Sequence, residues 1–487
     1  MRPTRLLLAA TALATTGVAI AQTRSLSPRD IGEAQQQHPQ LVAEFGGADT
    51  GPRGAYVESV GRRVAAYSGV VNPGQSFRFT TLNSAVENAF AVPGGYVYIT
   101  RQLMGLMGDE AELGFVLAHE TGHIAARHAQ ARRSASTRNS ILGVLGAVLG
   151  SVVGGGFGNL ISQGAQYGSQ LRTLSFSRDQ EYQADVLGIR YITAAGYDPL
   201  ASSTMLAALG RASALETRVQ GRNTRSTPEW ASTHPLSENR TRQAAATAQQ
   251  TGKAGRGLRN RDAFLAQLDG VYVDDDPAQG VIDGRSFTHP DLRLQFIVPT
   301  GYQMQNSARA VTVAGSAGQA QFSTGRFDGN FGTYIDRVLY ELTQGKTQVA
   351  RGPLQSTTIN GLPAAYMTGR ANTSSGAVDV SVMAYQFDAN TAYHFIMLTK
   401  AGQGMEPFGS MLNSLRRITP AEATAIRPRI IDVVTVRRGD TANSLANRMA
   451  YRDYRLERFL SLNGVSSASA LVPGQKVKLV VYGSRRT

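Results

Sequence analysis

Residues 119–123 read His-Glu-Thr-Gly-His, and this pentapeptide constrains the fold more than any other segment. Two histidines four positions apart share one face only if the segment is helical, and both imidazoles can then reach a single metal ion. Glu120 points toward the same cleft, where a carboxylate can act as general base on a zinc-bound water. The alternative is a pair of surface histidines beside a solvated glutamate.

The residues around the pentapeptide favour a helix. Asp109 is a suitable N-cap, and Glu112 stands three residues later, at capping-box spacing. Apolar residues then recur at helical intervals, at positions 113, 116, 117, 124 and 125. We therefore predict a helix that begins near Glu110 and runs past His128, a rigid element on which catalytic geometry is well held.

Composition limits the class of protein. A chain of 487 residues is too long for one ordinary domain, and 42% hydrophobic with 17% charged residues argues against wholesale disorder. The formal net charge is +14, but the basic residues are scattered and no aromatic RNA-binding motif accompanies them, so we expect no nucleic-acid partner. Two interpretations of the positive charge stay open. It could attract anionic lipid or cell-wall polymer, or it could only make the surface soluble.

The N-terminus has the pattern of a secretory signal. Arg2 and Arg5 precede a run of leucine and alanine, and Ala19-Ile20-Ala21 is a small-residue cleavage site, so residues 1–21 form the predicted signal peptide. An uncleaved anchor is the alternative, although the apolar run is short. Cysteine is absent, which excludes disulfides and a thiol nucleophile. An exported, cysteine-free chain indicates the bacterial periplasm.

The mature chain is expected to be an α+β multidomain protein. Residues 22–284 read as one mainly helical unit with a hairpin at residues 88–100, whose arms flank Pro93-Gly94-Gly95. The hairpin edge could pair with an extended substrate, or the hairpin could only support the metal helix. Residues 141–171 are uncharged and glycine-rich, which favours a mobile apolar lid or a membrane-touching hairpin over a buried helix or a full span.

Two further units follow. Residues 285–418 alternate apolar and polar positions, as at 292–299 and 378–382, with helical patches near 334–342 and 407–415, and form a separate α+β domain. Residues 428–484 read strand, helix, helix, strand, after a proline-containing joint.

A zinc hydrolase needs a third protein ligand and an open coordination position. Glu181 and Asp185 stand four residues apart and share one face of a predicted helix, so Glu181 can ligate the ion while Asp185 holds a ligand histidine from behind. Alone, this pair is more often a solvated helix face. Beside residues 119–123 it is the favoured candidate.

Several motifs together resemble the zinc metallopeptidases that include HtpX, the CAAX-type prenyl endopeptidases and the periplasmic BepA-type proteases. They occur in family order over roughly residues 30–250: Asn88-Ala89-Phe90 with Pro93-Gly94-Gly95, residues 119–123 with His128, Ser177-Arg178 with Glu181 and Asp185, Gly196-Tyr197-Asp198-Pro199, and Thr233-His234-Pro235 with Arg240. The resemblance implies a gluzincin-type fold that holds one zinc ion on His119, His123 and Glu181, with Glu120 as catalytic base.

The resemblance also implies that His234 lies near the metal, either as a switchable fourth ligand or as a stabiliser of the tetrahedral intermediate. Arg240 is a second candidate to hold the oxyanion, although Arg240 and His128 can equally brace the fold. The segment around Gly439-Asp440-Thr441 resembles a LysM module, a class that binds N-acetylated glycan, and the middle unit distantly resembles a PsbP-like fold.

These observations predict a periplasmic zinc metalloendopeptidase that hydrolyses misfolded or stalled envelope proteins. Its expected contacts are a protein or peptide substrate, peptidoglycan through the LysM-like module, and a membrane surface through residues 141–161. One rival is a non-proteolytic chaperone or cell-wall-tethered adaptor with a mainly structural zinc, and another is a peptidoglycan peptidase.

Overall fold

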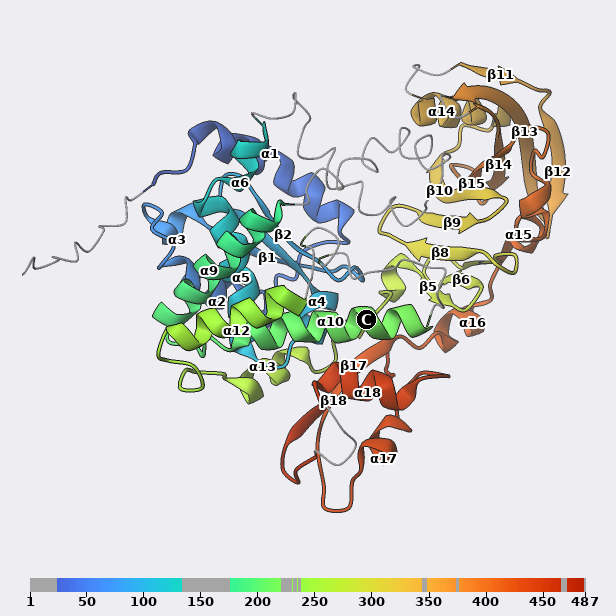
Figure 1. Ribbon diagram of the computed structural model, residues 1–487. Coiled ribbons are helices and arrows are strands. Elements are labelled where there is room, and N and C mark those ends of the chain that lie inside the picture. The colour runs from blue at the N-terminus through green and yellow to red at the C-terminus, as the bar shows by residue number, and fades with distance from the viewer. Residues whose placement is uncertain are drawn as a thin grey trace, which may run out of the picture.

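The computed structural model describes residues 24–133, 176–219, 230, 234, 238–343, 348–373, 376–465 and 471–485. The predicted signal at residues 1–21 and the uncharged segment at residues 141–171 lie outside this range. Figure 1 shows a mainly helical part, a β-rich part beside it and a small C-terminal part below. Among the described helices, none has both the length and the hydropathy needed to cross a bilayer.

The helical part surrounds a three-stranded sheet of order β1-β3-β2, in which β1 runs parallel to β3 and β2 antiparallel. The predicted hairpin is β2 and β3, while β1 is a further strand that the sequence did not indicate; β2 lies at one edge. The elements are α1 (Pro28–Glu44), α2 (Pro52–Ala65), α3 (Pro73–Ser76), β1 (Arg78–Leu82), β2 (Ala89–Val92), β3 (Tyr96–Thr100), α4 (Arg101–Leu106), α5 (Glu110–Ala125), α6 (His128–Arg133), α9 (Arg178–Ala194), α10 (Ala201–Val219), α12 (Glu238–Gln250) and α13 (Arg261–Leu268).

Helix α5 starts where the sequence predicts but ends earlier. Asp109 Oδ1 accepts a hydrogen bond from Glu112 N at 3.0 Å, which is the expected N-cap. The prediction that the helix runs past His128 was wrong: α5 ends at Ala125, and His128 begins the separate helix α6. Arg127 causes the break, because its φ of 58° lies in the left-handed region and cannot continue a right-handed helix.

Helix α5 lies in the core of the helical part. Every residue from Glu110 to Ile124 is buried, as expected for a helix that is apolar around most of its surface. Helix α9 packs closely against it, and a Cβ on Gly188 would stand 3.2 Å from His119 N. This close approach brings the Glu181–Asp185 segment against the pentapeptide.

The β-rich part contains two sheets, with orders β16-β7-β6-β5 and β11-β13-β14-β15-β10-β9-β8, and β12 pairs with β13. The alternating segments predicted near 292–299 and 378–382 overlap β7 and β14, and the two helical patches near 334–342 and 407–415 overlap α14 and α15. The elements are η2 (Pro277–Gln279), β5 (Val281–Asp283), β6 (Ser286–His289), β7 (Leu294–Ile297), β8 (Gln303–Asn306), β9 (Val311–Gly315), β10 (Gly318–Arg326), α14 (Phe331–Thr343), β11 (Val349–Arg351), β12 (Gln355–Ile359), β13 (Leu362–Thr373), β14 (Gly376–Gln386), β15 (Thr391–Lys400), η3 (Glu406–Phe408), α15 (Gly409–Ser414), β16 (Arg416–Arg417) and α16 (Pro420–Ala425).

The C-terminal part has the predicted strand, helix, helix, strand order: β17 (Arg429–Thr435), α17 (Ala442–Ala446), α18 (Arg455–Asn463) and β18 (Lys476–Tyr482). Strand β17 also pairs with β4 (Tyr272–Val273), and Ile431 belongs to the core of the helical part. Lys478 is fully buried, and its Nζ donates to the carbonyls of Gly105 and Met107 at 2.7 Å each. The C-terminal part therefore packs directly onto the end of α4 and the loop that precedes α5.

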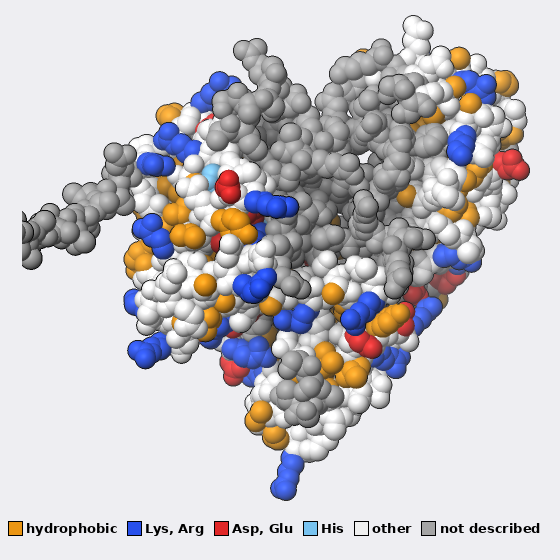
Figure 2. Space-filling model, viewed as in Figure 1, with side chains coloured by type: hydrophobic (Ala, Val, Ile, Leu, Met, Phe, Trp, Pro, Cys, Tyr) orange, Lys and Arg blue, Asp and Glu red, His pale blue; other side chains and the backbone are white. Residues whose placement is uncertain are grey.

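Basic side chains are dispersed on the face of the molecule that Figure 2 shows. Figure 2 shows Lys and Arg spread over the visible face, with hydrophobic and acidic side chains between them. This dispersion agrees with the scatter of basic residues along the sequence.

Candidate metal centre

Four buried side chains converge in the helical part: His119, His123, Glu181 and His234 each offer a ligand atom, and these atoms lie within 4.8 Å of one another. The two α5 imidazoles face each other, with 3.0 Å between their Nε2 atoms. Glu181, from α9, has its Oε2 3.6 Å from His119 Nε2 and its Oε1 2.8 Å from His234 Nδ1. The structure thus brings together the three predicted ligands and His234.

The donor set fits a zinc ion. Asp185 Oδ1 lies 3.0 Å from His119 Nδ1, which favours the proton on Nδ1 and leaves Nε2 directed at the cluster. Around a tetrahedral zinc ion with bonds of about 2.0–2.1 Å, neighbouring ligand atoms stand about 3.3 Å apart. The separations from His119 Nε2 to His123 Nε2 and His234 Nδ1 are 3.0 and 3.3 Å. Imidazoles with one carboxylate are also the ligands that zinc prefers.

Asp185 and Arg240 stand behind the ligands. Arg240 donates from Nε and Nη2 to Asp185 at 2.6 and 2.8 Å, and its Nη1 lies 2.8 Å from Glu181 Oε2. Burial alone would raise the pKa of Asp185, but hydrogen bonds from Arg240 and His119 lower it to about 2. Because the Arg240 guanidinium contacts Asp185 and Glu181, this geometry favours a bracing role over the oxyanion role expected from the sequence.

Glu120 is fully buried, and the described residues hold only one of its two carboxylate oxygens. Its Oε1 accepts a hydrogen bond from Trp230 Nε1 at 3.1 Å and lies 3.5 Å from His234 Nε2. Its Oε2 accepts no hydrogen bond from the residues that the structure describes. One oxygen is therefore fixed in place and the other is available.

Sequence reasoning missed Trp230. Its ring stacks on His234, with 4.7 Å between centroids and 24° between planes. His234 N donates to Trp230 O at 2.8 Å, so the two residues stand one helical turn apart. A signal was present: Trp230 is the only tryptophan in the chain and lies four residues before the motif histidine.

The charges of the cluster are strongly coupled. Burial lowers the pKa of His123 well below its usual range, and the neighbouring His119, His234 and His128 lower it further. Burial opposes ionisation of Glu181, but His234, His119 and Arg240 outweigh it and lower the pKa of that carboxyl. A neutral imidazole and an ionised carboxylate are the forms in which these side chains bind metals.

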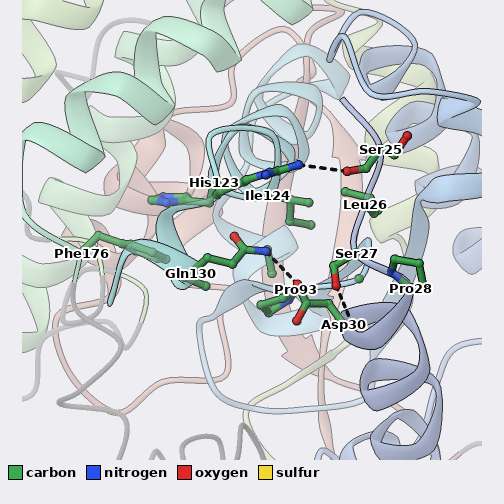
Figure 3. A pocket seen from close by; sticks show the side chains of 14 residues that line it. Ser25, Leu26, Ser27, Pro28, Asp30, Pro93, His123, Ile124, Gln130 and Phe176 are labelled. Atoms are coloured by element: carbon green, nitrogen blue, oxygen red, sulfur yellow. Dashed lines mark hydrogen bonds between the residues drawn. The ribbon is translucent and has the colours of Figure 1, made fainter. Parts of the chain in front are cut away.

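A cavity of about 520 Å³ opens beside His123 (Figure 3). Residues 25–28 form one wall, and Ala91, Pro93 and Gly94 of the hairpin form another. Arg127 Nη2 donates to Ser25 O at 3.2 Å, and Gln130 Nε2 donates to Asp30 Oδ2 at 2.8 Å. These bonds tie the N-terminal wall to the segment that follows α5.

Comparisons with known proteins agree with this geometry. Residues 52–248 match the model of peptidase family M48, and residues 434–480 match the LysM domain. A beta-barrel assembly-enhancing protease of Escherichia coli O157:H7 is 32% identical over 198 residues, which cover 40% of this chain and 39% of the relative. A mitochondrial metalloendopeptidase OMA1 of Schizosaccharomyces pombe is 28% identical over 212 residues, or 43% and 58% of the two chains.

The matches are partial. The chain spans about two fifths of the length of the first of these curated relatives. The cyanobacterial PsbP structure from Synechocystis is 9% identical, with a TM-score of 0.23, and the match covers 28% of this chain and 98% of that one. The PsbP-like fold of the middle region therefore stays a proposal.

The family resemblance predicted from the sequence is confirmed for two segments: residues 52–248 are similar to peptidase family M48, whose members are metal-dependent, and residues 434–480 to the LysM domain.

Proposed function

We propose that this chain is a zinc-dependent endopeptidase of the bacterial periplasm that hydrolyses misfolded or stalled envelope proteins. The observation that carries the proposal is Glu120, a buried carboxylate beside a cluster of four ligand side chains; one oxygen of this carboxylate accepts no hydrogen bond from the part of the chain that the structure describes. A structural metal site has no need of such a group. We assign His119, His123 and Glu181 as the ligands. When bound, the zinc ion supplies Lewis-acid polarisation of water and of the scissile carbonyl.

We assign the residues around the metal centre different roles in hydrolysis. Glu120 Oε2 takes a proton from the attacking water and later delivers it to the departing amine. Trp230 holds Glu120 Oε1, so the base keeps its orientation. His234 either donates a hydrogen bond to the developing oxyanion or occupies a fourth ligand position, and its proximity to both Glu120 and Glu181 supports each role. Asp185 and Arg240 position the ligands from behind.

The surroundings suit an extended peptide. Strand β2 lies at the edge of its sheet and packs near α5, so a substrate could pair with it as an added strand. The cavity beside His123 would take a substrate side chain, since Leu26, Ile124 and Phe176 line it with apolar surface. The matched relatives are named as proteases, one of them for beta-barrel assembly.

We propose the division of the chain that the sequence indicates, with one boundary moved. Residues 1–21 are an export signal, 22–284 was the predicted peptidase unit, 285–418 a separate α+β unit and 428–484 the LysM unit. Because β5 (Val281–Asp283) pairs with β6, the α+β unit begins before residue 285. Export and a LysM domain together support a periplasmic location with contact to peptidoglycan.

Glu120→Gln tests the assignment. The variant keeps the size and burial of the side chain but cannot accept a proton. We expect one zinc ion per chain, measured by elemental analysis, and a loss of unfolded-casein hydrolysis of at least about 100-fold. Chelation should abolish wild-type hydrolysis and added zinc should restore it. Undiminished turnover by the variant would reject Glu120 as the base.

A non-proteolytic chaperone or adaptor remains the second candidate, because His234 lies within the ligand cluster and a permanent fourth ligand would close the site. Aggregation of an unfolded client decides between the two. Suppression without cleavage, unaffected by Glu120→Gln, would favour the chaperone. Release of fragments from purified sacculi would instead indicate a peptidoglycan peptidase.

A further inference from the structure

We propose that Gln183 and His128 form a neutral hydrogen-bond relay that fixes the tautomer of His123 and directs its Nε2 lone pair at the metal. His128 and Gln183 are positioning residues, and the proposal rests on the assignment of His123 as a zinc ligand. The sequence motifs include His128 only as a residue that can brace the fold, and nothing in the sequence singles out Gln183.

The relay is a chain of two short contacts. His123 Nδ1 lies 2.8 Å from His128 Nδ1, and His128 Nε2 lies 2.8 Å from Gln183 Oε1. The two rings meet edge to face, with 4.9 Å between centroids and 74° between planes. On its other side, His123 Nε2 faces the cluster, 3.0 Å from His119 Nε2 and 3.6 Å from Glu181 Oε1.

The Gln183 amide oxygen determines which atom donates in each hydrogen bond of the relay. Gln183 Oε1 can only accept, so His128 must donate from Nε2. A neutral His128 then has a lone pair on Nδ1, which accepts from His123 Nδ1–H. His123 is left with its lone pair on Nε2, the atom that faces the cluster. The reverse direction would place a proton on His123 Nε2 and prevent metal binding there.

The backbone is bent to make this contact. Helix α5 stops at Ala125, and Arg127 takes φ 58°, a conformation that is uncommon and costly for a non-glycine residue. The turn places His128 beside His123, although both residues could not share a face of one continuous helix five positions apart. His128 is buried, at 3% exposure, whereas Gln183 lies at the surface.

Helix α9 consequently orients both α5 histidines by different means. Asp185 reaches His119 Nδ1 directly with a carboxylate, at 3.0 Å. Gln183 acts on His123 Nδ1 through His128, and its neutral amide is the last group of the relay. The same helix also supplies Glu181, so one rigid element fixes one ligand and the tautomers of two others.

Zinc affinity, measured by chelator competition on the full chain, tests the relay without any peptide substrate. His128→Phe keeps a ring but removes the acceptor, and we expect about 10–100-fold weaker binding, the range for loss of an outer partner of a ligand histidine. His128→Asn places an amide oxygen where Nδ1 stood and should recover most of that loss. Gln183→Leu should weaken binding several-fold, and Gln183→Glu should bind at least as tightly as the wild type.

His394→Phe is the matched control, because His394 is also buried and hydrogen-bonded, to Tyr334, in the β-rich part. Its zinc affinity should equal that of the wild type. The visible spectrum of the cobalt-substituted protein should change in His128→Phe and not in His394→Phe. Far-ultraviolet circular dichroism of each variant confirms that the fold is retained.

Wild-type affinity in both His128→Phe and Gln183→Leu would overturn the relay, and so would equally weak binding by His128→Asn and His128→Phe, which would indicate packing alone. The outcome is separate from that of the proposed function. A chain that binds zinc through the relay but cleaves no protein would refute the peptidase proposal only. An active peptidase with unchanged affinity in these variants would refute the relay only.

Discussion

The metal centre and the junction between β18 and the loop before α5 both bury charge, but they treat polar atoms differently. At the junction, Lys478 Nζ donates to two carbonyls, and Glu112 accepts from Gly108 N at 2.7 Å and from Thr204 Oγ1 at 2.6 Å. At the metal centre, Glu120 Oε2 accepts no hydrogen bond from the described residues, and four ligand atoms converge.

This difference distinguishes a structural contact from a candidate site of chemistry. Buried polar groups are nearly always hydrogen-bonded, so a fully partnered network needs no ligand to explain it. An available carboxylate oxygen beside converging imidazoles is unfavourable for the fold on its own and marks a site that a ligand would complete. The junction therefore holds the C-terminal part on the helical part, and the metal centre is the site at which we propose the reaction.

The largest expected effect is on zinc affinity, and it distinguishes two buried glutamates. Glu181→Gln removes the anionic ligand and should weaken zinc binding by at least about 100-fold, beyond the effect of an outer partner. Glu112→Gln, in the junction, should leave zinc affinity unchanged. Chelator competition measures both. Equal zinc affinities in the two variants would contradict the distinction between the metal centre and the junction.

The next effect concerns stability. Lys478→Met leaves the carbonyls of Gly105 and Met107 without their donor and should lower the free energy of unfolding by about 2–4 kcal/mol. Zinc affinity should not change. Lys476→Met is the control on the same strand, because that lysine is partly exposed, pairs with Asp262 at 3.5 Å and should cost less than about 1 kcal/mol. Denaturant unfolding measures both, and equal losses would contradict a special role for Lys478.

The sequence predicts the metal helix because local spacing encodes it, and the assignment of its ligands stays a prediction. Asp109 caps the helix, and the pentapeptide's two histidines need only one helical turn to meet. The helix end was missed because Arg127 is an ordinary residue in a left-handed conformation that its neighbours impose. The sequence around Arg127 contains no pattern that predicts this break in the helix.

Contacts between distant segments were predicted less completely. Trp230 and Glu120 are 110 residues apart, and their hydrogen bond follows only from the packed fold. Lys478 looks like a surface residue on a short strand, yet it is fully buried against a loop more than 370 residues earlier. The resemblance to a LysM module predicts its fold but not what that module is packed against.

The junction also makes stability depend on pH. Burial lowers the pKa of Lys478 to about 7, while a lysine in the unfolded chain titrates near 10.5. Between these values the unfolded chain holds a proton that the folded chain has released, so stability rises as the pH increases above 7. The gain from pH 7 to 9 is at most about 2.7 kcal/mol. Unfolding of the wild type and of Lys478→Met across this range measures it, and parallel curves would contradict the lowered pKa.

The smallest effect tests the Trp230 hydrogen bond to the base. Trp230→Phe keeps an aromatic ring against His234 but removes the Nε1–H that Glu120 Oε1 accepts. We expect kcat to fall about tenfold, equivalent to about 1.4 kcal/mol, because the carboxylate loses its fixed orientation. KM and zinc affinity should stay unchanged, since neither substrate contact nor any ligand is altered. If zinc affinity falls instead, Trp230 has a structural role in the metal site. The result would then contradict the proposal that the indole orients the Glu120 carboxylate.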